Sequence, residues 1–178
     1  MENREELAKH FAELKFNKGA EIGTERGYFA KTLLDANPKL KLSCIDAWSV
    51  YKGYRDHTRQ NKLDRYYAET KELLSQFSPR VELIRGWSMD AVKEFEDESL
   101  DFVYIDANHD FQHATNDIAE WSRKVRKGGI VSGHDYVPYR SSCECQVKDV
   151  VDAWVKAYRI KDLQITTEDF PSWMYTKL

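Results

Sequence analysis

The chain has 178 residues, of which 42% are hydrophobic and 32% are charged, a composition typical of one folded domain and unlike that of a disordered chain. Lysine and arginine number 27 against 30 aspartates and glutamates, and the net charge of -3 argues against a nucleic-acid-binding or membrane-surface protein. No apolar run approaches the roughly 20 residues that span a bilayer, and the polar start lacks a signal peptide's apolar stretch. We therefore expect a single cytoplasmic domain over residues 1–178, without nucleic-acid or membrane partners.

The first half of the chain alternates between helical and strand-like apolar patterns. Within residues 1–15 we expect an N-terminal helix over 5–14, followed by a strand at 20–22. A helix over 29–34 should end near Asn37, because a proline disfavours helix in the residue before it. A second strand occupies 40–46. The polar, aromatic-rich segment 48–66 then either forms a lid over a binding site or remains a surface loop.

The second half continues the same alternation. We expect a helix through Leu73 and Leu74, a strand at 81–84, a helix over 89–95 and a strongly apolar strand at 100–105. A helix over 114–125 should be stopped by the cation and glycines of 127–129, before a strand at 130–132. A helix over 147–155 and a hairpin of 163–165 with 173–176 complete the chain.

Three cysteines, Cys44, Cys143 and Cys145, occur in the sequence. An odd number without a CxxC pair argues against both a disulfide framework and a structural zinc site. We therefore expect thiols that form no disulfide.

Strands that alternate with helices predict an α/β fold with a doubly wound, mostly parallel sheet covered on both faces. The C-terminal hairpin adds antiparallel strands, which brings the total to seven. Ligands of such sheets bind beyond the carboxyl ends of the strands. Residues able to take part in binding or catalysis lie at the end of, or just after, all five predicted parallel strands, namely Gly23, Asp46, Gly86-Trp87-Ser88, Asp106 and His134-Asp135.

The loop from Glu21 to Gly27 contains two glycines, Gly23 and Gly27, between a strand and a helix. Missing side chains let a ligand approach the backbone closely, although the same glycines also suit an ordinary turn. Asp46 ends the next strand, where a carboxylate can accept both hydroxyl hydrogens of a ribose. Together these residues predict a site for an adenosine-containing ligand.

Glu21 distinguishes between NAD and S-adenosylmethionine as that ligand. A dinucleotide site has the pattern GxGxxG, whereas Glu21 stands at the position of its first glycine. A carboxylate there would repel a pyrophosphate and suit the cationic methionine portion of S-adenosylmethionine. The sequence therefore favours S-adenosylmethionine.

These motifs, together with the Lys-Gly-Gly of 127–129, resemble the class I methyltransferases over nearly the whole chain. More narrowly, residues 104–109 and 133–136 resemble the methyltransferase-24-like group of small O-methyltransferases related to the macrocin and mycinamicin sugar enzymes. Catechol and caffeoyl-CoA methyltransferases are similar more distantly. The resemblance implies a Rossmann-like fold and transfer of a methyl group from S-adenosylmethionine.

The resemblance also implies roles for individual residues. Glu21, Gly23, Thr24 and Gly27 would hold the methionine end of the cofactor, Asp46 the ribose and Trp87 with Ser88 the adenine, while Asp106 would approach the sulfonium. Two of these residues have structural alternatives: Trp87 could be a core aromatic, and Ser88 could cap the following helix.

Methyl transfer to oxygen requires a base or a metal ion to activate the acceptor. By the resemblance, Asp106, His134 and Asp135 would bind a divalent cation, and His109 would be the general base. Relatives have a carboxylate or an amide where this chain has His134, and imidazole shifts the preference from magnesium to manganese, iron or zinc. Alternatively no metal binds, Asp135 supports its loop and His109 is a hydrogen-bonding brace.

We expect an S-adenosylmethionine-dependent O-methyltransferase of a small hydroxylated compound or sugar. A metal-independent methyltransferase of another acceptor, such as an amine, and a non-catalytic cofactor-binding domain are the alternatives. Because little of the chain lies outside the core fold, a second subunit of a homo-oligomer could complete the acceptor pocket.

Overall fold

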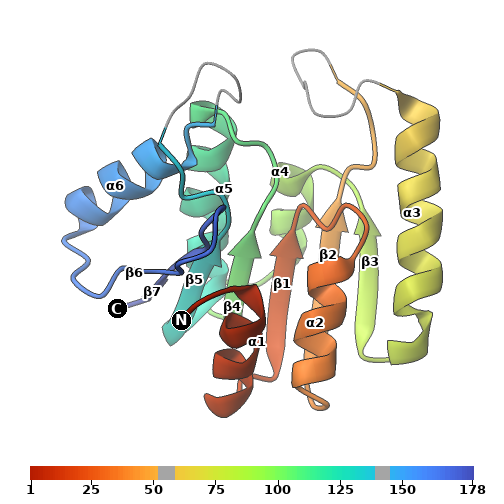
Figure 1. Ribbon diagram of the computed structural model, residues 1–178, viewed down its shortest axis with the longest axis horizontal. Helices are drawn as coiled ribbons and strands as arrows, with labels where there is room; N and C mark the ends of the chain where they lie inside the picture. The colour runs from red at the N-terminus through yellow and green to blue at the C-terminus, as the bar shows by residue number, and fades with distance from the viewer. Residues whose placement is uncertain (52–58, 139–144) are drawn as a thin grey trace.

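A computed structural model describes residues 1–51, 59–138 and 145–178, and at its centre these residues form a sheet of seven strands. The strand order is β3-β2-β1-β4-β5-β7-β6 (Figure 1). Strands β1 to β5 pair in parallel, whereas β7 is antiparallel to both β5 and β6. The strands are Lys18–Ile22 (β1), Lys41–Asp46 (β2), Val81–Arg85 (β3), Leu100–Ile105 (β4), Val125–Gly133 (β5), Gln164–Ile165 (β6) and Trp173–Thr176 (β7). The predicted fold is confirmed.

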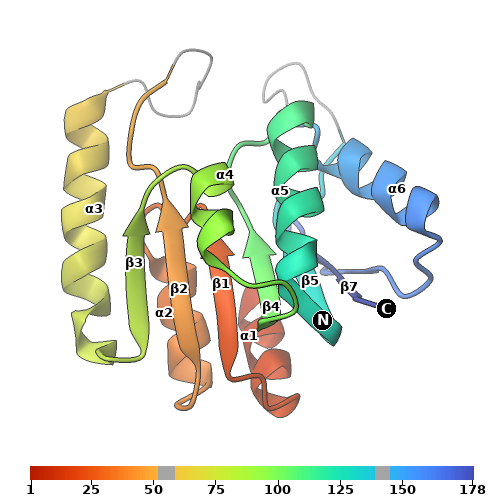
Figure 2. The ribbon, with the colours of Figure 1, turned by 180° about the vertical axis from the view of Figure 1, so that it is seen from behind.

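Helices cover both faces of this sheet (Figures 1 and 2). On one face α1, α2 and the end of α3 pack on the strands, and on the other face α4, α5 and α6 do so. The helices are Arg4–Glu13 (α1), Tyr28–Ala36 (α2), Gln60–Leu74 (α3), Ser88–Ala91 (α4), Phe111–Lys124 (α5) and Val147–Tyr158 (α6), with short 3-10 turns at Ser75–Phe77 and Val92–Glu94.

The strand β4 shows how one sequence builds two cores. Successive side chains of a strand point to opposite faces of the sheet. Phe102 and Tyr104 therefore join the core beneath α1 and α2, and Val103 and Ile105 join the core beneath α4 and α5. Phe102, Val103 and Tyr104 are completely buried. Burial of each such side chain contributes roughly 1.5–3 kcal/mol before conformational entropy is subtracted.

The junction between α5 and β5 differs from the sequence prediction. Helix α5 ends at Lys124 and β5 begins at Val125, so Gly128 and Gly129 lie inside the strand. The pairing between β4 and β5 is irregular here, and a Cβ atom at Gly129 would lie 2.4 Å from the Asp101 carbonyl oxygen. Gly129 permits close approach of two strands at an irregularity, Gly128 has a φ of 72°, and the prediction that the two glycines stop the helix is wrong.

The predicted lid segment 48–66 is not a single loop. Residues 60–66 belong to α3, which begins at Gln60, so this part is not a surface loop, and its role as a lid stays a prediction. The Gln60 side-chain amide donates a hydrogen bond to the carbonyl of Trp48 over 2.9 Å and ties the preceding loop to the helix. Residues 52–58 of the segment lie outside the described residues.

Other sequence expectations concern the cysteines and the membrane. Cys44 and Cys145 are buried thiols outside any disulfide among the described residues, and Cys143 is not among those residues. Within the described ranges, no helix is both long enough and apolar enough to cross a membrane.

The strand order reverses between β1 and β4. From β1 the chain adds β2 and β3 on one side, and then returns to add β4 and β5 on the other side. Loops that leave the carboxyl ends of β1 and β4 therefore diverge and open a crevice. Ile22 pairs with Ile105, so Gly23 and Asp106 follow at the same level on the two sides of this crevice.

Candidate active site

A cavity of about 960 Å³ opens at the carboxyl ends of β1, β2 and β4, a volume suited to a ligand of cofactor size. Residues that follow four different strands line it, among them Gly23, Asp46, Trp87 and Asp106, as their positions in the sequence predict. His134 and Asp135 follow β5 and do not line the cavity, although they contact residues that do.

The turn after β1 is built for close packing. Gly23 has a φ of 91°, and a Cβ atom on it would lie 1.9 Å from the carbonyl oxygen of Asp106. Its own N–H donates to the carbonyl of Ile45 over 2.8 Å, which fixes the loop against β2. Gly27 has a φ of 74° and is the N-cap residue of α2. Both glycines therefore occupy positions where an L side chain would be strained.

Glu21 and Thr24 present polar atoms to the cavity. Glu21 is only 3% exposed, and neither its Oε2 atom nor the Thr24 hydroxyl has a hydrogen-bond partner among the described residues. Burial raises the pKa of Glu21 to about 8, and the nearby Asp106 and Asp46 carboxylates add to this shift. An unpartnered buried carboxyl group in a cavity suits a ligand that brings a positive charge.

Asp46 braces the two loops that border the cavity. Its carboxylate accepts hydrogen bonds from the backbone N–H of Glu25 at 2.8 Å and of Trp48 at 2.7 Å. Each carboxylate oxygen has two lone pairs, so these bonds are compatible with further bonds to a ribose. Asp46 thus combines a position in the cavity wall with a structural role.

Trp87 and Ser88 differ in their surroundings. Trp87 is 44% exposed, lines the cavity and lies edge-on to Tyr51, so the core-aromatic alternative is wrong. Trp87 is also the N-cap residue of α4, so the alternative in which Ser88 caps that helix is wrong as well. The Ser88 hydroxyl instead donates to Asp117 and accepts a hydrogen bond from Trp121 Nε1 at 2.8 Å.

Asp117 is a cavity residue that the sequence analysis missed. It lies on α5, is 4% exposed, and burial raises its pKa to about 6 although the bond from Ser88 lowers it. The available signal is a carboxylate directly before Ile118 in the apolar stripe of a helix, which is weak evidence in a single sequence.

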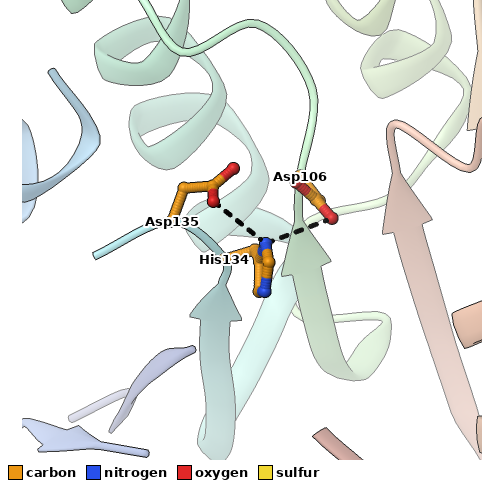
Figure 3. A group of neighbouring side chains, drawn as sticks. All are labelled: Asp106, His134 and Asp135. Carbon is orange, nitrogen blue, oxygen red and sulfur yellow. Dashed lines mark ion pairs between the residues drawn. The ribbon is translucent and has the colours of Figure 1, made fainter. Parts of the chain in front are cut away.

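Asp106, His109, His134 and Asp135 form an acid–histidine cluster beside the cavity. His109 Nε2 lies 3.1 Å from Asp135 Oδ2 and 3.6 Å from Asp106 Oδ1. His134 Nδ1 lies 3.3 Å from Asp135 Oδ1 and 3.7 Å from Asp106 Oδ2, between the two carboxylates (Figure 3). Each imidazole therefore faces both carboxylates, and each carboxylate faces both imidazoles.

Backbone contacts hold this cluster at the ends of β4 and β5. The N–H of Asp106 donates to the carbonyl of Ile22 over 2.7 Å, and the N–H of His134 donates to that of Ile105 over 3.0 Å. Asp135 has a φ of 57°, in the left-handed region that aspartate tolerates better than most residues. Burial alone would raise the pKa of Asp135, but the His134 bond and the charges of both histidines lower it.

The predicted metal ligands are close together. One ligand atom from each of Asp106, His134 and Asp135 can be chosen so that all three lie within 4.8 Å of one another. Two carboxylates and one imidazole are a donor set that divalent transition metals accept. These side chains are between 11% and 24% exposed, so the group is partly shielded from water.

Residues adjacent to His109 have structural roles. Asp110 is the N-cap of α5 and accepts the backbone N–H of His113 at 2.9 Å, while its second oxygen pairs with the His113 ring at 2.7 Å. The Asn108 side chain donates to the hydroxyl of Tyr51. The loop after β4 is thus tied to the helix that follows it and to the rim of the cavity.

Both ends of the chain contribute charged residues to the cavity, and the sequence analysis missed them. Arg4 is in the first turn of α1, and Glu168 is in the loop between β6 and β7. Arg4 Nη1 lies 3.8 Å from Asp106 Oδ2. Neither residue belongs to a motif, so no sequence signal pointed to them.

Comparisons with known proteins agree with this geometry. A family model described as a methyltransferase domain matches residues 20–136. No curated protein matches the chain.

Three solved structures are similar in fold. An O-methyltransferase from Bacillus cereus in complex with S-adenosylhomocysteine has a TM-score of 0.71 at 14% identity, over 98% of this chain and 80% of that one. The O-methyltransferase TomG from Streptomyces achromogenes, in complex with S-adenosylmethionine, has a TM-score of 0.68 at 17% identity, over 98% and 80%. An O-methyltransferase family protein from Burkholderia thailandensis has a TM-score of 0.71 at 12% identity, over 97% and 55%.

Proposed function

The chain belongs to the methyltransferase-domain family and is a class I S-adenosylmethionine-dependent methyltransferase, and on this premise we propose that it methylates a hydroxyl oxygen of a small compound or sugar. The observation that carries the proposal is the position of Asp106 and His109. They line the same cavity as Glu21 and Gly23, so groups able to activate an acceptor adjoin the groups suited to the cofactor.

The residues of the cofactor half fit S-adenosylmethionine. Glu21, Gly23 and Thr24 would bind its methionine end, where the unpartnered polar atoms of Glu21 and Thr24 can bond to the ligand. Asp46 would accept the ribose hydroxyls, and Trp87 with Ser88 would border the adenine. When bound, the cofactor supplies an electrophilic methyl group on its sulfonium.

His109 would be the general base for the acceptor hydroxyl. Its Nε2 atom faces Asp135 at 3.1 Å, so a proton on Nε2 leaves Nδ1 to take the acceptor's proton. Asp135 would orient the ring and stabilise its charged form, as a carboxylate does for a catalytic histidine elsewhere. A base of this kind accelerates a reaction by roughly 10²- to 10⁴-fold.

Asp106, His134 and Asp135 would hold a divalent cation. The short separations among their ligand atoms and the mixed oxygen and nitrogen donors favour manganese, iron or zinc over magnesium. Such an ion, when bound, would lower the pKa of an acceptor hydroxyl. Dialysis against a chelator should then abolish activity, and manganese should restore it better than magnesium. Full activity in chelator would assign the cluster to metal-independent chemistry.

Calorimetry tests the cofactor and an acceptor screen tests the reaction. We expect binding of S-adenosylmethionine and S-adenosylhomocysteine but not of NAD; the reverse result would refute the proposal at its first step. Panels of hydroxylated and amino compounds, matched in size, should then yield methylated products from the hydroxylated panel. Products from the amino panel alone would support the amine alternative.

A further inference from the structure

Arg4 is a cation surrounded by acidic groups at one end of the cavity. Its guanidinium faces Asp106 at 3.8 Å and lies 5.7 Å from the centre of the Phe29 ring. Its charge also reaches Glu21, Asp135 and Glu168. Burial raises the pKa of Glu21, and the charge of Arg4 opposes that rise. Arg4 therefore presents a positive charge, and Glu21 a buried carboxyl group that a cationic ligand would ionise, to the same part of the cavity.

The position of Arg4 in its helix has no advantage for helix stability. Arg4 is the first residue of α1, directly after the N-cap Asn3, where the helix dipole disfavours a positive charge. The same turn contains Glu5 and Glu6, which suit the dipole. The location of Arg4 at the cavity thus calls for an explanation outside the helix.

A second arginine lines the cavity but is already paired. Arg26 contacts Glu69 through two nitrogens at 2.9 and 3.0 Å, and its guanidinium lies about 5 Å from the rings of Tyr28 and Tyr66. The contact of Arg4 with Asp106 is longer, at 3.8 Å. Arg4 also interacts with the Tyr104 hydroxyl, and of the two arginines in the described cavity wall it is the one paired less closely with a carboxylate.

We propose that Arg4 binds the α-carboxylate of the cofactor's methionine portion, while the buried carboxyl group of Glu21 takes the ammonium. The proposal rests on the proposed function. An amino acid is a zwitterion: its carboxylate would pair with the Arg4 cation, and its ammonium would ionise the Glu21 carboxyl group, so that no buried charge is left unpaired. A planar guanidinium can bind a carboxylate through two parallel hydrogen bonds.

Three ligands that differ only at the amino-acid end test this assignment by calorimetry. They are S-adenosylhomocysteine, its decarboxylated analogue with an aminopropyl chain, and 5'-methylthioadenosine, which lacks the amino acid. The proteins are the unchanged chain, Arg4→Gln and Arg4→Lys. Lys9→Gln is the matched control, because it removes one positive charge from an exposed position of the same helix.

We expect Arg4→Gln to lower the affinity for S-adenosylhomocysteine by roughly 10- to 100-fold, the effect of losing a charge-assisted hydrogen bond. The unchanged protein should lose a similar factor when the ligand lacks the carboxylate, and Arg4→Gln should not distinguish these two ligands. Arg4→Lys should fall between, and Lys9→Gln should match the unchanged protein. Binding of 5'-methylthioadenosine should stay the same in all four proteins.

Two results would overturn the assignment. An equal loss of affinity for all three ligands in Arg4→Gln would mean that the residue acts through Asp106 or through the fold. Unchanged binding of all three would mean that Arg4 serves another partner, such as an anionic acceptor. If the unchanged protein bound none of the ligands, the proposed function itself would fail, so the two failures are distinguishable.

Discussion

Glu21 is a single buried residue that lowers the stability of the folded protein above its usual pKa. Its carboxyl group is buried and its pKa is raised to about 8 from the usual value near 4.5, chiefly by burial. The folded protein therefore keeps this group neutral at pH values where the unfolded chain ionises it. Ionisation in the unfolded chain alone favours unfolding. A bound cationic ligand would favour the ionised form in the folded protein as well and would remove this cost.

Replacement of Glu21 by glutamine should remove this pH dependence. In the unchanged protein the Glu21 contribution to the free energy of unfolding falls as pH rises from about 4.5 to about 8, because unfolding then releases a proton. At pH 7 the penalty is roughly 3 kcal/mol, so Glu21→Gln should be more stable by about that amount. Urea unfolding of both proteins at pH 5 and pH 8 measures this difference in the free energy of unfolding. An equal effect at both pH values would contradict the burial argument.

The rate of methyl transfer should depend on His109. We expect His109→Ala to lower the rate by roughly 10²- to 10⁴-fold, because the acceptor's proton loses its base. Affinity for S-adenosylhomocysteine should change by less than about threefold, which is under 1 kcal/mol. Single-turnover kinetics and calorimetry separate the two quantities, and His10→Ala, outside the cavity, is the control. An unchanged rate with intact cofactor binding would refute the assignment.

Among the elements of the fold, the turn from β1 to α2 forms the part of the cavity wall that packs most tightly on its neighbour. Its backbone approaches the loop after β4 so closely that only glycine fits at position 23. Gly86, after β3, also lines the cavity, but a Cβ atom there would meet nothing within 4 Å. Of these two glycines in the cavity wall, the space at position 23 excludes any side chain, whereas the space at position 86 admits one.

The pair Gly23→Ala and Gly86→Ala tests this difference with the same chemical change. Gly23→Ala combines a positive φ with a backbone overlap and should cost roughly 3 kcal/mol or more of folding free energy. Gly86→Ala should change stability by less than about 1 kcal/mol. Urea denaturation of both variants supplies the comparison. Similar losses would show that the turn after β1 relaxes.

At the scale of the whole molecule, the cavity joins segments from both ends of the chain. Arg4 at the start and Glu168 near the end meet the loops after β1 and β4 at the point where the strand order reverses. A ligand that fills this cavity contacts the loops after four strands and segments near both ends of the chain. Its binding should therefore stabilise the domain as a whole.

Thermal unfolding should report this coupling. S-adenosylhomocysteine at 100 times its dissociation constant should add about 2.7 kcal/mol, which for this chain length raises Tm by roughly 5–10 °C. NAD at the same concentration should leave Tm unchanged. Scanning calorimetry measures both, and a shift with NAD alone would contradict the cofactor assignment.

The sequence by itself determined the order of helices and strands, the seven-stranded sheet and the residues at the strand ends. These features depend on local patterns, namely apolar periodicity, glycines and the proline at position 38. Boundaries were less accurate where a local signal had two uses, as at Gly128 and Gly129, which suit both a helix end and an irregular strand.

Only the tertiary structure decided which side chains meet. Segments far apart in the chain meet where Ser88 contacts Asp117 and Trp121 and where Arg4 approaches Asp106. The exposure of Trp87 likewise depends on the packing of distant segments around it. Such contacts depend on strand order and on which helix covers which face, and no local pattern encodes them. The sequence predicted the glycine loop and Glu21, whereas the fold brought Arg4 to the same cavity and left the Glu21 Oε2 atom buried without a hydrogen-bond partner among the described residues.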